Sequence, residues 1–206
     1  MYKELVTKVF AEISEQAFQE LQISNIELVF SEQVADANAY VPLTIETLNI
    51  FEVTDVTHLG RVEIMPRLFE ALNMLPNNAR EAYIKHLLRH ELRHIYQVEH
   101  NKSLLTENLR FIPCALGAGE NPIERDADGW AESKASTELE VAVSRLSTLY
   151  YRIHGKILVT NRERQEIRKL WLKVALLSRP NILRFIKIGR AILGRIAARL
   201  RRKGVR

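Results

Sequence analysis

The spacing of apolar residues changes twice along the chain, and these changes constrain its fold. Residues 2–21 carry apolar side chains at three- and four-residue intervals, which predicts a helix lying on a core. Short β-forming segments follow, which we interpret as three or four strands in a meander: 26–30, 39–43, 48–53 and 61–65. After Pro66 the helical period returns and predicts helices at 67–74, 79–98, 122–153 (continuous or broken), 161–177 and 181–202.

Strands followed by helices indicate an α+β fold, with an N-terminal helix, a small sheet of three or four strands and then a helical subdomain. The 206 residues suffice for one domain and one appendage. Residues 179–206 hold 10 of the 30 Lys and Arg residues and no acidic residue. We therefore expect a domain over 1–178 and a basic amphipathic helix in 179–206.

The helix predicted at 181–202 is apolar on one side and basic on the other, which leaves three interpretations. Its apolar side can pack on the domain, or the helix can lie on an anionic membrane surface. Its cations can also bind nucleic acid, which we regard as the weaker alternative because phosphate contacts need no broad apolar face.

Cysteine content and the N-terminus predict the cellular location. Cys114 is the single cysteine, so an intramolecular disulfide and a cysteine-rich zinc finger are excluded, and a reducing cytoplasm is expected. The N-terminal segment is amphipathic and contains acidic residues, unlike a secretory signal. No stretch reaches the roughly 18 apolar residues of a membrane span. We expect a cytoplasmic protein, with peripheral membrane contact through 181–202 as the alternative.

His90, Glu91 and His94 form an HExxH motif within the helix predicted at 79–98. Residues four apart in a helix lie about 40° apart on one face, so both imidazoles can reach one ion. Glu91 lies beside them, where it can act as a general base on a metal-activated water.

The motif continues the apolar side of its helix, where a carboxylate and two imidazoles would be costly without partners. A metal site supplies such partners. The alternative is a surface helix whose His and Glu are solvated. We favour burial because other polar residues can form the solvent face of this helix, namely Lys85, Arg89, Arg93 and Gln97.

A catalytic zinc site needs a third protein ligand, and Glu124 is the best candidate. Asn121 and Pro122 predict the start of a helix in which Glu124 and Asp128 share a face. Asp128 can then accept a hydrogen bond from a ligand histidine, most simply His90. Asn-x-x-Glu is also the pattern of a capping box, which would explain Glu124 but not Asp128. Asp126 points elsewhere on this helix.

HELRH followed by ERDAD, in the form HExxH…ExxxD, resembles the gluzincin zinc metallopeptidases over residues 50–135. The resemblance implies zinc held by His90, His94 and Glu124, with Glu91 as general base and Asp128 supporting a ligand histidine. It also implies that a substrate peptide lies along an edge strand, for which 61–65 is our candidate. It further implies that a His or Tyr near the C-terminal end of the domain donates a hydrogen bond to the oxyanion that forms during hydrolysis. The candidates are His154, Tyr151 and Tyr150.

Other features receive no role in the chemistry. His86 lies too far along the helix from His94 to share its ion, and we assign nothing to His58, His100 or Cys114. Residues 101–121 form a long connection between the two halves of the site, as a cleft wall, a lid or a structural excursion. The sequence thus predicts a zinc-dependent metallopeptidase. The alternative is a non-catalytic, metal-stabilised protein that docks on an anionic surface.

Overall fold

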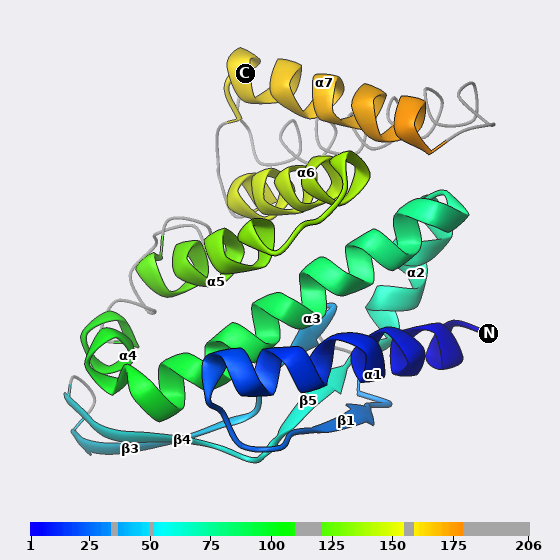
Figure 1. Ribbon diagram of the computed structural model, residues 1–206. Coiled ribbons are helices and arrows are strands. Elements are labelled where there is room, and N and C mark those ends of the chain that lie inside the picture. The colour runs from blue at the N-terminus through cyan, green and yellow to red at the C-terminus, as the bar shows by residue number, and fades with distance from the viewer. Residues whose placement is uncertain (34–36, 50–51, 110–120, 155–158, 179–206) are drawn as a thin grey trace.

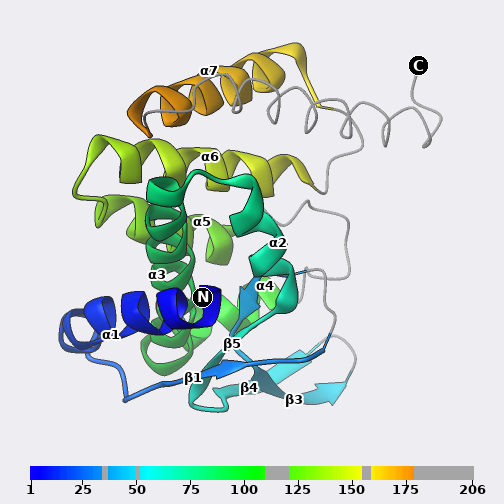
Figure 2. The same ribbon diagram turned by 90° about the vertical axis from the view of Figure 1, so that its right-hand side faces the viewer.

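A computed structural model describes residues 1–33, 37–49, 52–109, 121–154 and 159–178. The α+β fold is confirmed, since an N-terminal helix and two small sheets precede a helical region. Helix α3 (Asn77–His100) crosses the centre of the molecule (Figure 1). Helix α1 (Tyr2–Leu21) and the strands lie on one side of α3, and α5 (Pro122–Ser133), α6 (Glu138–His154) and α7 (Asn161–Leu177) are layered on the other (Figure 2).

The strands form two separate sheets, so the predicted meander is wrong. Strand β5 (Arg61–Ile64) is central, with β1 (Glu27–Phe30) parallel on one side and β2 (Ala39–Tyr40) antiparallel on the other. Strands β3 (Leu43–Asn49) and β4 (Glu52–His58) pair antiparallel in the second sheet.

Two of the predicted strands are divided between elements. The segment 39–43 contains Pro42, which has no backbone N–H to donate to a neighbouring strand. The chain passes there from β2 to β3. The prediction for 48–53 falls partly on residues 50–51, which lie outside the described ranges, and its two ends belong to the paired strands β3 and β4.

In the described residues the predicted helices agree with the observed ones. Helix α2 (Pro66–Met74), α3 and α7 (Asn161–Leu177) match within a few residues. The region 122–153 is broken into α5 (Pro122–Ser133) and α6 (Glu138–His154), because Thr137 caps a new helix through the amide of Glu140. Helix α4 (Lys102–Leu109) lies in the predicted connection 101–121, of which residues 110–120 are not described.

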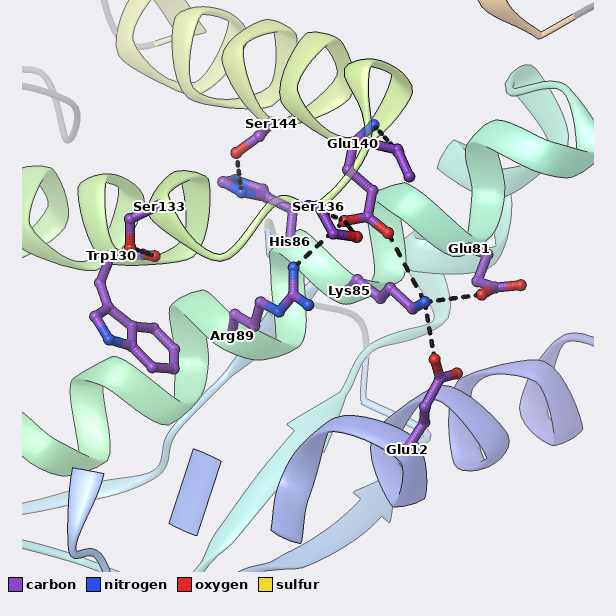
Figure 3. Close-up of polar contacts among 11 residues, drawn as sticks. Glu12, Glu81, Lys85, His86, Arg89, Trp130, Ser133, Ser136, Glu140 and Ser144 are labelled. Atoms are coloured by element: carbon purple, nitrogen blue, oxygen red, sulfur yellow. Dashed lines mark hydrogen bonds and ion pairs between the residues drawn. The ribbon is translucent and has the colours of Figure 1, made fainter. Parts of the chain in front are cut away.

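Helix α3 has no solvent face over most of its length, contrary to our prediction. From Ala79 to Glu99 every residue is buried or partly buried, because α1, α5 and α6 pack around the helix. Lys85 and Arg89 instead join an ion-pair cluster between α1, α3 and α6 (Figure 3). The acidic partners in this cluster are Glu12, Glu81 and Glu140, at 3.0–3.8 Å.

No helix among the described residues combines the length and the apolar character needed to cross a membrane. The predicted basic helix at 181–202 lies outside the described ranges.

Candidate metal centre

Helices α3 and α5 bring three candidate ligands together. The Nε2 atoms of His90 and His94 lie 2.9 Å apart. Glu124 Oε2 is 3.2 Å from His90 Nε2, and Glu124 Oε1 is 3.6 Å from His94 Nε2. In the described part of the chain, this is the one group of three or more side chains arranged to hold a metal ion. The two helices therefore place the predicted ligands as the sequence spacing requires.

The N-terminus of α5 shows how Glu124 reaches the site. The Asn121 side chain caps this helix by accepting a hydrogen bond from the Ile123 amide at 2.9 Å. Pro122 occupies the first turn, where no amide hydrogen is needed. With the turn fixed in this way, the Glu124 carboxylate faces the two imidazoles. The geometry thus favours the ligand interpretation over a capping role.

Asp128 lies one turn further along α5 and contacts His90 as predicted. Its Oδ1 is 2.9 Å from His90 Nδ1, and both side chains are buried. Because a carboxylate accepts, Nδ1 must carry the hydrogen, and neutral His90 presents the lone pair of Nε2 to the site. This is the arrangement in which an outer carboxylate orients a metal-binding histidine.

Asp128→Ala should weaken zinc binding roughly 10–100-fold, because His90 would lose the partner that fixes its ring and its tautomer. Competition with a chromophoric chelator measures this change. Asp126→Ala is not a neutral control, since Asp126 accepts hydrogen bonds from Arg93 and Gln97. Asp55→Ala provides one, since Asp55 is partly exposed and pairs with Lys102. Equal zinc affinity in the Asp128 variant and wild type would contradict the assignment.

Gln97 was assigned to the solvent face by the sequence, and this prediction is wrong. Its side chain is completely buried, and its Oε1 lies 2.8 Å from His94 Nδ1. Each candidate ligand histidine therefore has a partner at its Nδ1 atom. The signal that could have found Gln97 is its position three residues after His94, on the same side of the helix.

The candidate site has an unsatisfied acceptor that fits a cation. With both histidines neutral, the buried Oε2 of Glu124 has no hydrogen-bond donor. Two imidazole lone pairs and one carboxylate then converge in a buried space, which is costly without a positive charge. Two nitrogens and one carboxylate oxygen match the His₂Glu donor set of catalytic zinc sites, so these residues fit the ion.

In the metal-free protein, a protonated histidine can supply the positive charge that these groups need. Burial lowers the pKa of His90, but hydrogen bonds to Asp128 and Glu124 outweigh burial and hold the pKa well above its usual value. Burial and the neighbouring His90 lower the pKa of His94. In the metal-free site these shifts favour a proton on His90 over one on His94.

Zinc binding should release about one proton near neutral pH, because His90 must be neutral to act as a ligand. The pKa of His90 is raised, so zinc competes with this proton at every pH below that pKa. The apparent affinity should then fall as the pH is lowered. Calorimetry of zinc binding in two buffers with different enthalpies of ionisation measures the number of protons. Release of no proton at pH 7 would show that His90 is neutral before the metal binds.

Glu91 shares a cavity of about 240 Å³ with the three ligands. Burial raises its pKa from 4.5 to about 7; the carboxylates of Glu124 and Asp128 raise it further, and His90 opposes them. A base with a pKa near the working pH is suited to move a proton in both directions. The rest of the cavity lining is largely apolar and includes Ala39, Val41, Leu43, Val98 and Leu105.

The candidate oxyanion donors are separated by the structure. Tyr151 lines the cavity with a side chain that is half exposed, and partial burial and the nearby carboxylates raise the pKa of its phenol, so it stays protonated. Tyr150 lines a different cavity, between α2, α6 and α7. His154 is the last residue of α6, and its side chain is outside the described set.

The remaining histidines lie away from the three candidate ligands. His86 is buried and contacts Ser144 at 2.7 Å (Figure 3), and burial and the neighbouring His90 lower its pKa to about 4. It therefore remains neutral beside Asp128. His58 pairs with Glu99, and His100 lies 2.9 Å from the carbonyl oxygen of Gln22. Cys114 is outside the described residues.

Comparisons with protein-family models, curated proteins and solved structures found no significant match to this chain.

Proposed function

We propose that this protein is a zinc-dependent metallopeptidase that hydrolyses peptide bonds. The observation that carries the proposal is the convergence of His90, His94 and Glu124 beside the buried carboxyl group of Glu91. A site that only stabilised the fold would need neither the second glutamate nor an adjoining cavity.

The residues of the chain can carry the steps of hydrolysis. Zinc, when bound, supplies Lewis-acid chemistry that activates water and polarises the scissile carbonyl. Glu91 takes the proton of the attacking water and passes it to the leaving amine. The protonated phenol of Tyr151 can donate a hydrogen bond to the oxygen that becomes negative during the attack.

The strand available to a substrate is not the one that the sequence indicated. Strand β5, our candidate at 61–65, is paired on both sides, so its backbone groups are occupied. Strands β1 and β2 are the two edges of the same sheet, and of these β2 carries Ala39 and Tyr40, which line the cavity. A substrate peptide can therefore extend the sheet at β2 through main-chain hydrogen bonds.

The purified full chain should contain one zinc ion per molecule and cleave members of an unstructured peptide library. A chelator should abolish cleavage, and added zinc should restore it. Mass spectrometry of the products and metal analysis provide both measurements. One bound zinc without any cleavage would instead favour a metal-stabilised binding protein.

A further inference from the structure

The side-chain amide of Gln97 connects the two helices of the metal centre. Gln97 Nε2 donates to the carbonyl oxygen of Ile123 at 3.0 Å and to Asp126 Oδ2 at 2.8 Å. Its Oε1 lies 2.8 Å from His94 Nδ1. Ile123 and Asp126 lie on either side of Glu124 in the first turns of α5. One buried amide therefore contacts one candidate ligand and both flanks of another.

The chemistry of these partners fixes the orientation of the amide. A carbonyl oxygen and a carboxylate only accept hydrogen bonds, so the NH₂ group of Gln97 must face Ile123 and Asp126. The amide oxygen must then face His94. A flipped amide would place its oxygen against two other oxygens and leave the Ile123 carbonyl without this donor, at a cost that burial makes large.

The orientation of the amide in turn fixes the tautomer of His94. An amide oxygen accepts, so His94 Nδ1 must carry a hydrogen. Neutral His94 therefore has its lone pair on Nε2, the atom that faces His90 and Glu124. No other described side chain is hydrogen-bonded to His94 Nδ1.

Asp126 is itself held in place. Arg93 donates to both of its carboxylate oxygens, from Nε at 2.8 Å and from Nη2 at 3.1 Å. The Arg93 guanidinium also lies over the ring of Tyr96, 4.1 Å from its centroid. Such a bidentate pair has a defined geometry, so the acceptor that orients Gln97 is rigid.

We propose that Gln97 is a positioning residue that selects the metal-binding tautomer of His94 and holds the Glu124 turn of α5 in register with α3. Asp126 and Arg93 anchor it. The inference rests on the proposed metal centre but not on peptidase activity. Gln97 touches neither substrate nor the reacting atoms, and it acts through the geometry of two ligands.

Gln97→Met tests this role, because methionine has a similar volume and lacks both the donor and the acceptor. Zinc affinity, measured by chelator competition, should fall roughly 10–100-fold. The d–d absorption bands of the Co²⁺-substituted protein should also change, which a general loss of stability would not cause. Gln19→Met, on the exposed side of α1, is the matched control and should leave affinity and spectrum unchanged. A Gln97→Met protein with wild-type zinc affinity and cobalt spectrum would overturn the proposal.

A second measurement needs no variant and no metal. Long-range ¹H–¹⁵N NMR of the imidazoles in the metal-free wild type, recorded at a pH high enough that His90 is also neutral, should show hydrogen on Nδ1 of His94 and a lone pair on Nε2. Hydrogen on Nε2 in neutral His94 would also overturn the proposal, even if the variant fails to fold. A wild-type protein that binds no zinc would refute the metal centre, while this spectrum would still decide whether Gln97 selects the tautomer.

Discussion

Glu91→Gln should abolish most peptide hydrolysis while the protein keeps its fold and its zinc. Glu91 is buried beside the ligands but is not one of them, so its replacement leaves the donor set unchanged. Glutamine has nearly the same shape and cannot accept the proton of the attacking water. Loss of a general base typically costs about 10²–10⁴-fold in rate, and we expect kcat to fall by this factor.

The control for this variant lies on the same helix. Glu81→Gln removes a carboxylate that pairs with Lys85, away from the metal centre, and should leave kcat unchanged. Zinc content should remain one ion per chain in both variants. If the Glu91 variant cleaves peptides at the wild-type rate, Glu91 is not the base.

Stability measurements separate catalysis from folding at this position. Burial raises the pKa of Glu91 to about 7, so the folded protein binds this proton more tightly than the unfolded chain does. Stability therefore falls as the pH rises between the unfolded and folded pKa values, and the loss is complete above the folded value. Glutamine avoids this loss, so the metal-free variant should be at least as stable as metal-free wild type at about pH 8. Thermal unfolding of both proteins provides the comparison.

His94→Ala should remove zinc from the protein. The variant lacks one of three candidate ligands. Its zinc affinity should therefore fall by more than the roughly 100-fold that is the upper range for removing a residue that only hydrogen-bonds to a ligand. Zinc should also no longer raise the unfolding temperature, because a ligand stabilises only by binding the folded state. Metal analysis after dialysis and thermal unfolding with and without zinc measure both effects.

His100→Ala provides the matched control, since His100 lies at the exposed end of the same helix and contacts the backbone of Gln22. It should keep stoichiometric zinc. Stoichiometric zinc in the His94 variant as well would place the ion elsewhere in the protein.

The parts of the site that the sequence predicted depend on spacing within one helix. His90 and His94 lie four residues apart, as do Glu124 and Asp128, and a helix places each pair on one face regardless of its surroundings. Asn121 and Pro122 indicate where α5 begins, which fixes the direction of its carboxylates. Local rules were therefore sufficient for these residues.

The parts that the sequence did not predict depend on contacts between distant segments. The pairing of β1 with β5 is parallel, and no local pattern distinguishes it from a meander. Three polar residues of α3 were predicted to lie on its solvent face, namely Lys85, Arg89 and Gln97. Whether a polar side chain is buried depends on which helices cover it, and only the packing of α1, α5 and α6 around α3 determines this.

The enclosure of α3 affects how substitutions between relatives of this chain should be interpreted. A helix without a water-facing side has few positions at which evolution can substitute freely, since nearly every side chain between Ala79 and Glu99 has neighbours to satisfy. Invariance along α3 will therefore reflect packing and hydrogen bonding as much as chemistry. Under the proposed function, a natural homologue that exchanges only Glu91 and retains His90, His94, Glu124 and Gln97 is expected to bind the metal without hydrolysing peptides.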